Sequence, residues 1–137
     1  MMYLAKDPLV MSSTAGSSRI LLCEDDAVIA MHFQAVLETS GYVVVGPVCT
    51  GTEALVEADR HPPDLALVDI GLRGAIDGIS VAAELASRAV PVIFLTGDYQ
   101  RACLDGREFA ADILIKPVSD GAILKAVASV LTSEQQC

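Results

Sequence analysis

Polar side chains that can do chemistry stand where apolar runs of this chain end. They are, in sequence order, Glu24, Asp25, Asp69, Thr96 and Lys116. Clustered carboxylates suit a hard cation such as Mg²⁺, which keeps several waters and completes its shell with phosphate oxygens. An ammonium and a hydroxyl group suit the oxygens of the same phosphate. Together these groups describe phosphoryl transfer to an aspartate that acts as the nucleophile.

Expected β-strands hold each of these residues at one edge of a sheet. Short apolar runs bounded by turn residues predict strands at 19–24, 43–48, 64–69, 91–96 and 112–116. Helical spacing of apolar residues predicts helices at 27–39, 52–60, 78–88 and 119–132. A further helix is expected at 98–110, where apolar residues are few and Gly106 interrupts the pattern. This alternation predicts an α/β fold with a doubly wound, five-stranded parallel sheet. Such sheets bind their ligands at the carboxyl ends of the strands, where the polar residues stand.

Composition indicates one folded domain. The chain has 137 residues, 53% of them hydrophobic, and no apolar run reaches the roughly 20 residues of a membrane-spanning helix. A net charge of −9 argues against nonspecific nucleic-acid binding, because phosphate repels an acidic surface. The domain is expected at 19–132, between a flexible tail at 1–18 and a short tail at 133–137. Scattered cysteines and no visible export signal indicate a cytoplasmic setting without a membrane partner.

Each candidate residue also has an ordinary structural explanation. Asp26 is expected to cap the first helix, as aspartate often does. Asp69 and Thr96 could each serve a turn. Lys116-Pro117 could end a strand before a helix that starts with proline. These explanations cover the residues singly, but they do not explain why such residues end successive strands.

The chain resembles the receiver domain of two-component response regulators over nearly all of 19–132. The motifs that carry the resemblance are Glu24-Asp25, Asp69, Thr96 and Lys116-Pro117. The resemblance implies a flavodoxin-like (βα)5 fold with strand order 2-1-3-4-5. It also implies that Asp69 accepts a phosphoryl group from a sensor histidine kinase or a histidine phosphotransfer protein.

The same resemblance implies a role for each site residue. Mg²⁺ would bind the acidic pair, Asp69 and the backbone carbonyl of Gly71. The acidic pair is either Glu24-Asp25 or Asp25-Asp26, and we prefer the first because it directly follows Cys23. Thr96 and Lys116 would contact the acyl phosphate. The lysine-proline bond is commonly cis in this family, which would aim Lys116 at the site.

Two departures from the receiver pattern concern the readout of phosphorylation. Receivers usually carry an aromatic switch residue three positions before the lysine, where this chain has Ile113. The segment Phe-Leu-Thr-Gly-Asp-Tyr at 94–99 resembles the Phe-Ala-Thr-Gly-x-Tyr signature of a subgroup of single-domain receivers in bacterial stress signalling, which also lacks that aromatic. Thr96, Tyr99 and Ile113 are therefore the switch candidates.

We therefore expect a stand-alone phospho-acceptor switch that acts by binding an unknown downstream protein, without an output domain. It would be no enzyme beyond assisting its own phosphorylation and dephosphorylation. One alternative is an interaction domain that works without phosphate. Another is a phosphatase of the haloacid-dehalogenase type, which normally needs a second aspartate where this chain has Gly71.

Overall fold

Five parallel strands form the centre of the molecule in a computed structural model that describes residues 18–136. The strands are β1 (Arg19–Cys23), β2 (Val43–Val48), β3 (Leu65–Asp69), β4 (Val92–Thr96) and β5 (Asp112–Ile115). They lie in the order β2-β1-β3-β4-β5, and every neighbouring pair is parallel. The predicted fold class and strand order are confirmed.

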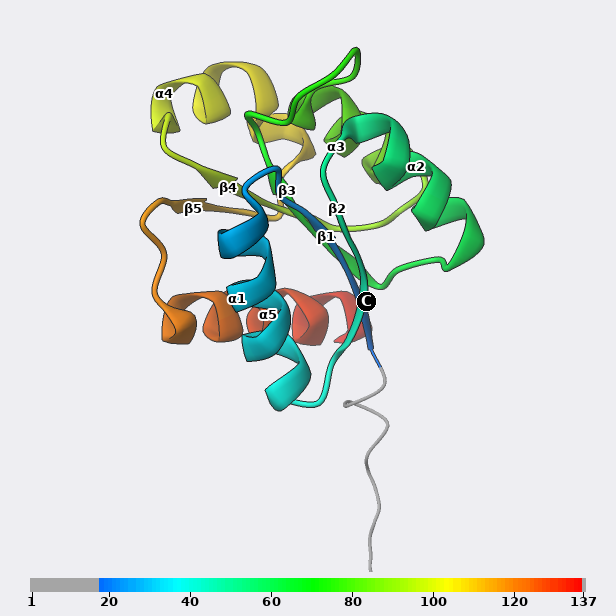
Figure 1. Ribbon diagram of the computed structural model, residues 1–137, viewed down its shortest axis with the longest axis vertical. Helices are drawn as coiled ribbons and strands as arrows, with labels where there is room; N and C mark the ends of the chain where they lie inside the picture. Colours follow the sequence, from blue (N-terminus) through cyan, green and yellow to red (C-terminus); the bar gives the residue numbers. More distant parts are fainter. Residues whose placement is uncertain (1–17, 137) are drawn as a thin grey trace, which may run out of the picture.

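Helices cover both faces of this sheet (Figure 1). They are α1 (Ala27–Thr39), α2 (Gly51–Arg60), α3 (Gly78–Ser87), α4 (Tyr99–Arg101) and α5 (Asp120–Gln136). Helices α1 and α5 lie on one face, while α2, α3 and α4 lie on the other. Within the described part of the chain, no helix is both long enough and apolar enough to cross a membrane.

The two faces of the sheet each contribute to a separate apolar layer. In β3, Leu65 and Leu67 pack toward α1 and α5, whereas Ala66 and Val68 pack toward α2 and α3. Successive side chains of a strand point to opposite faces, so a strand covered on both sides needs apolar residues throughout. That is why β3 and β4 were recognisable as continuous apolar runs, and every residue of both strands is buried.

The prediction of one regular helix at 98–110 is wrong. Three short pieces replace it, namely α4, a π-helical turn η3 (Ala102–Gly106) and a 3-10 turn η4 (Arg107–Phe109). Gly106 lies against the ring of Phe94, and a Cβ atom at this glycine would stand 2.8 Å from Phe94 Cε2. Close packing of Gly106 on the sheet thus accompanies the break in the regular helix.

The predicted chain ends differ from the structure in one respect. Helix α5 continues to Gln136 instead of ending at 132, so residues 133–136 are helical and do not form the expected tail. The apolar pattern stops earlier, but glutamate and glutamine are good helix formers and extend the last turns. The tail predicted at 1–18 lies outside the described residues except for Ser18.

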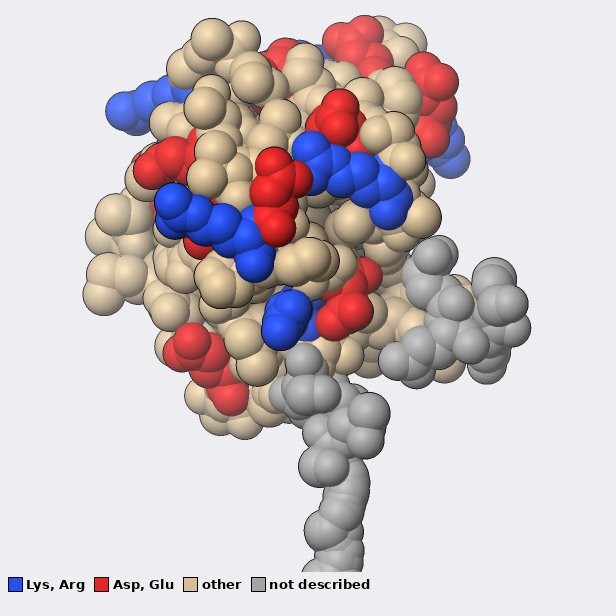
Figure 2. Space-filling model, turned by 90° about the vertical axis from the view of Figure 1, so that its right-hand side faces the viewer, with Lys and Arg blue, Asp and Glu red and all other residues tan. Residues whose placement is uncertain are grey.

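Charged side chains of both signs are interspersed on the face that Figure 2 shows, and Lys and Arg do not gather there into a basic patch. On α2 and α3, Arg60 pairs with Glu57 at 3.3 Å, and Arg88 pairs with Asp59 at 2.6 Å. Phosphate-rich partners need a concentration of basic side chains. This face offers none.

Helix α3 approaches the end of β3 so closely that only glycine fits at its first residue. A Cβ atom on Gly78 would collide with the carbonyl oxygen of Asp69 and stand 2.7 Å from Ile70 Cα. The backbone N–H of Gly78 donates to the Ile70 carbonyl at 3.3 Å. The contact therefore fixes the loop that follows Asp69.

Gly78→Ala is expected to lower the free energy of unfolding by about 2 kcal/mol or more, because the colliding atoms belong to the backbone and cannot rotate away. Urea denaturation measures the change. Gly121→Ala is the control, since no atom within 4 Å would meet its Cβ and the residue lies in α5. The control should be neutral or stabilising by up to about 1 kcal/mol. Equal effects of both substitutions would contradict the close-contact explanation.

Candidate functional site

The carboxyl ends of β1 and β3 bring three acids together. Cys23 pairs with Val68 in the sheet register, so the residues that follow each strand become neighbours. One carboxylate oxygen from each of Glu24, Asp25 and Asp69 lies within 4.8 Å of the others. Glu24 and Asp69 are only 1% and 7% exposed. The cluster is therefore a compact, largely buried set of oxygen ligands.

Lys116 joins two of these acids from the end of β5. Its Nζ donates to Glu24 Oε1 at 2.8 Å and to Asp69 Oδ2 at 3.2 Å. The backbone N–H of Lys116 donates to the Thr96 carbonyl at 2.8 Å, which ties its position to β4. The peptide bond between Lys116 and Pro117 is cis, as the resemblance implies.

Burial and neighbouring charges shift the pKa values of Glu24 and Lys116. Burial raises the pKa of Glu24 above its ordinary value, and repulsion from Asp69 adds to the effect, while hydrogen bonds from Lys116 and the Asp26 N–H oppose it. Burial by itself disfavours the charge of Lys116. Its hydrogen bond to Glu24 and its attraction to Asp69 outweigh that penalty and raise the Lys116 pKa. The lysine is thus held as a cation.

Asp26 serves the first helix instead of the acidic cluster. Its Oδ1 accepts the N–H groups of Val28 and Ile29 at 3.0 and 3.1 Å, which makes it the N-cap of α1. The expected capping role is confirmed. This geometry favours Glu24 and Asp25 as the acidic pair over Asp25 and Asp26.

Thr96 and Gly71 stand beside Asp69 on either side. Gly71 N–H donates to Asp69 Oδ1 at 2.9 Å, so both oxygens of Asp69 are held. Thr96 ends the neighbouring strand β4 and is 3% exposed. Its Oγ1 accepts the N–H of Asp98 at 2.8 Å. The hydroxyl hydrogen stays available for a further acceptor.

Two of the switch candidates line one surface cavity. Tyr99 and Ile113 border a hollow of about 250 Å³ together with Arg107. Tyr99 is 47% exposed, whereas Ile113 is partly buried and packs against the apolar layer below α2 and α3. The structure thus brings the two residues to the same surface, and β4 separates the strand of Ile113 from the strand of Asp69.

Arg73 was not among the predicted site residues, but it contacts the cluster directly through Asp25. Its Nε lies 3.1 Å from Asp25 Oδ2, and its side chain is 83% exposed. Arg73 stands in the glycine-bearing loop after Asp69. A basic residue so close to Asp69 was a signal in the sequence that could have indicated a site residue. Its partner Asp25 follows a different strand, so the pairing is not apparent from the local sequence.

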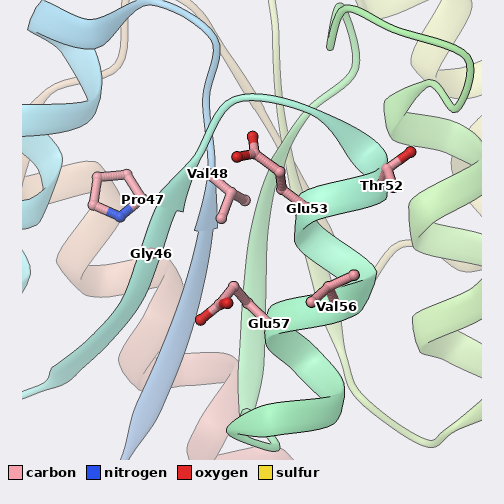
Figure 3. A pocket seen from close by; sticks show the side chains of 7 residues that line it. All are labelled: Gly46, Pro47, Val48, Thr52, Glu53, Val56 and Glu57. Atoms are coloured by element: carbon pink, nitrogen blue, oxygen red, sulfur yellow. The ribbon is translucent and has the colours of Figure 1, made fainter.

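Two larger hollows lie apart from the three acids. A groove of about 480 Å³ runs between β2 and α2, where Glu53 and Glu57 extend from the helix toward the strand (Figure 3). A second hollow of about 590 Å³ is mostly apolar and borders Lys116 from the side of α1. Its lining residues are Val28, Ile29, His32, Phe33, Lys116, Pro117 and Val118. Only this second hollow adjoins the lysine of the site.

The family model of the response regulator receiver domain matches residues 20–128. The chain belongs to this family. Among its relatives, the transcriptional regulatory protein PdtaR of Mycobacterium tuberculosis is 33% identical over 88% of this chain and 60% of its own length. The phyllosphere-induced regulator PhyR of Methylorubrum extorquens is 31% identical over 87% of this chain and 45% of its own length. The chain thus spans less than two-thirds of the length of these relatives, and its expected stand-alone arrangement stays a prediction.

Solved structures of receiver domains are similar to this chain over most of its length. The signal receiver domain of a modulated diguanylate cyclase from Desulfovibrio desulfuricans G20 has a TM-score of 0.77 and 33% identity, over 88% of this chain and 98% of that one. The PhyR receiver domain of Erythrobacter litoralis has a TM-score of 0.79 and 26% identity, over 86% and 92% of the two chains. Receiver domains are signalling modules of two-component systems, and they generally bind Mg²⁺ at an acidic pocket.

Without divalent cations, Glu24→Gln is expected to raise the free energy of unfolding at pH 7 by on the order of 1 kcal/mol. The folded receiver binds the Glu24 proton more tightly than the unfolded chain does, because the folded pKa is raised. The stability this proton contributes is fully present below the ordinary value of 4.5 and is lost as pH rises through the raised pKa. Glutamine mimics the protonated form and avoids that loss.

Urea denaturation in a chelator measures this difference as a function of pH. The advantage of Glu24→Gln should disappear below about pH 4.5. Glu108→Gln on exposed η4 serves as the control and should stay within about 0.5 kcal/mol of the wild type. A destabilised Glu24→Gln variant at pH 7 would show that the Lys116 contact outweighs burial and repulsion.

Proposed function

We propose that this receiver is a phospho-acceptor switch of a two-component phosphorelay, phosphorylated on Asp69. The observation that carries the proposal is the placement of Asp69 between a cation and two further acids. Lys116 holds Asp69 Oδ2, Gly71 N–H holds Oδ1, and Glu24 and Asp25 lie within 4.8 Å. A carboxylate so oriented is a nucleophile beside a site for a divalent ion.

The donor set fits Mg²⁺. Glu24, Asp25 and Asp69 offer hard oxygen ligands at one edge, and the backbone carbonyl of Gly71 is the fourth protein ligand that we assign. Few ligands from the protein leave positions for water and phosphate, as Mg²⁺ prefers. When bound, the ion would neutralise charge on the phosphoryl oxygens.

The residues of the site divide the remaining work of phosphoryl transfer. One oxygen of Asp69 forms the new bond to phosphorus while the bond from phosphorus to the donor breaks. Lys116, held as a cation, then loses part of its contact with Asp69 and pairs with a phosphoryl oxygen. Thr96 donates its hydroxyl hydrogen to another phosphoryl oxygen. Phosphorylation adds about −1.5 to −2 charge at this point.

The apolar hollow beside Lys116 suits the phosphodonor, for which we propose a sensor histidine kinase or a histidine phosphotransfer protein. Val28 on its rim is 77% exposed, and an exposed apolar patch next to reactive groups is typical of a protein contact. The free cysteines Cys23, Cys49 and Cys103 fit a reducing, cytoplasmic compartment. The downstream partner would be a protein that recognises the surface around α4 and β5.

The phosphatase alternative lacks its general acid. Gly71 has no side chain, and its backbone N–H is already engaged by Asp69. The proposed activity is therefore limited to the receiver's own phosphorylation and dephosphorylation. The phosphate-independent alternative differs in one measurable respect, because its partner affinity would not change on phosphorylation.

A small phosphodonor such as acetyl phosphate with Mg²⁺ is expected to give a base-labile adduct of one phosphoryl group, detected by intact-protein mass spectrometry. Asp69→Asn should abolish the adduct, because an amide oxygen is a poor nucleophile. Asp64→Asn is the matched control, since Asp64 lies exposed beside the opposite end of the same strand. An adduct that persists in Asp69→Asn, or that never forms in the wild type, would exclude the proposed acceptor.

Phosphorylation is expected to change hydrogen exchange in residues 97–109, because Thr96 couples Asp69 to that segment. The Thr96 hydroxyl can donate to phosphate while it still accepts the Asp98 N–H, so its movement is passed on. Thr96→Ala should remove most of this change although Asp69 is still phosphorylated. Thr96→Ser keeps the hydroxyl and should preserve the change. An unaltered response in Thr96→Ala would assign the coupling to another group.

A further inference from the structure

Arg73 forms an ion pair with Asp25, which is one of the three candidate metal ligands. Its Nε contacts Asp25 Oδ2 at 3.1 Å, while the Asp25 side chain is 19% exposed and the Arg73 side chain 83% exposed. The guanidinium thus reaches from solvent to the one member of the acidic cluster that is open to it. Glu24 and Asp69 are buried and already paired with Lys116.

The two cations share the three acids without overlap. Lys116 contacts Glu24 and Asp69, and Arg73 contacts Asp25. Three carboxylates within 4.8 Å repel one another strongly unless cations lie among them. Arg73 therefore supplies a second counter-charge, at the one acid of the three that Lys116 does not contact.

The backbone of Arg73 is held in place while its side chain is exposed. An isolated parallel β-bridge joins Arg73 to Thr50, the N-cap of α2. The long side chain can leave Asp25 by rotation about its own bonds, without movement of the loop. A change of partner at Asp25 then involves Arg73 and leaves the surrounding fold intact.

We propose that Arg73 is an exchangeable counter-ion of the acidic site, which pairs with Asp25 in the metal-free protein and is displaced when Mg²⁺ binds. A divalent ion ligated by Asp25 repels the guanidinium and competes for the same carboxylate. Arg73 consequently lowers the affinity for Mg²⁺ and offsets part of the negative charge of the metal-free site. The inference rests on the Mg²⁺ binding assigned under the proposed function.

Isothermal titration calorimetry with MgCl₂ on the full chain tests this competition. Arg73→Ala is expected to tighten Mg²⁺ binding by roughly two- to sixfold, the range that corresponds to loss of one exposed competing ion pair. The gain should shrink at about 0.5 M KCl, where screening weakens the pair. Arg73→Lys keeps the charge and should restore at least part of the weaker wild-type affinity.

Arg60→Ala is the matched control for net charge. Arg60 is also an exposed arginine in a single ion pair, with Glu57 on α2, and its loss changes the net charge equally. It should leave the Mg²⁺ affinity close to that of the wild type. If Arg73→Ala tightens binding no more than Arg60→Ala does, or if Arg73→Lys behaves like Arg73→Ala, the competition at Asp25 is refuted.

A direct readout follows the Arg73 side chain itself. The Nε–H resonance of Arg73 in ¹⁵N NMR spectra should shift on addition of Mg²⁺, while that of Arg60 should not. An Arg73 resonance that does not shift at saturating Mg²⁺ would refute the displacement of Arg73 from Asp25. It would leave the proposed phospho-acceptor function intact. A wild-type receiver that binds no Mg²⁺ would overturn both, so the two failures are distinguishable.

Discussion

The repulsion among Glu24, Asp25 and Asp69 is the constraint on which the rest of this structure depends. Parallel pairing of β1 with β3 forces the acids together, and burial of Glu24 and Asp69 removes much of the water that would screen them. Two cations reduce this repulsion. Lys116, at the end of β5, pairs with Glu24 and Asp69, and Arg73, in the loop after β3, pairs with Asp25. The site is thus a set of close opposing charges, which Mg²⁺ and a phosphoryl group would rearrange under the proposed function.

The apolar layers make such a costly arrangement possible. Strands β3 and β4 are buried along their whole length, so their register is fixed by packing on both faces. Helix α3 reaches the sheet at Gly78, directly behind Asp69, and Asp77 caps this helix by accepting the Ser80 N–H at 2.9 Å. The carboxylates therefore cannot relax apart without disturbing the core.

The sequence was informative where burial dictates residue type. Buried parallel strands need unbroken apolar runs, and the polar residue that ends each run marks the functional edge, so Asp69 and Lys116 were recognisable. The irregular α4 region was not, because it depends on the contact between Gly106 and Phe94, which tertiary packing creates. Arg73 was missed for a similar reason, since its partner Asp25 becomes a neighbour only through sheet pairing and loop conformation.

An aromatic rotation is not required to connect this site to its surface. Thr96 accepts the N–H of Asp98, and Asp98 accepts the N–H of Arg101 at 3.0 Å, which starts α4. Arg101 then pairs with Asp77 at 2.8 Å, and Asp77 is the N-cap of α3. Hydrogen bonds from the Ser80 N–H, together with the charge of Arg101, lower the pKa of Asp77 and keep it ionised.

These contacts link the start of α4 to the N-cap of α3, which follows the loop after Asp69. Under the proposed phosphorylation, a shift of Thr96 toward the phosphoryl group would change the cap of α4. The π-turn and the 3-10 turn that follow α4 replace a continuous regular helix, so this segment would be the one to respond. Ile113 leaves the cavity beside Tyr99 without a competing ring. Tyr99 is the exposed aromatic side chain that begins α4, so under the proposed function it is the residue that would follow a movement of this helix.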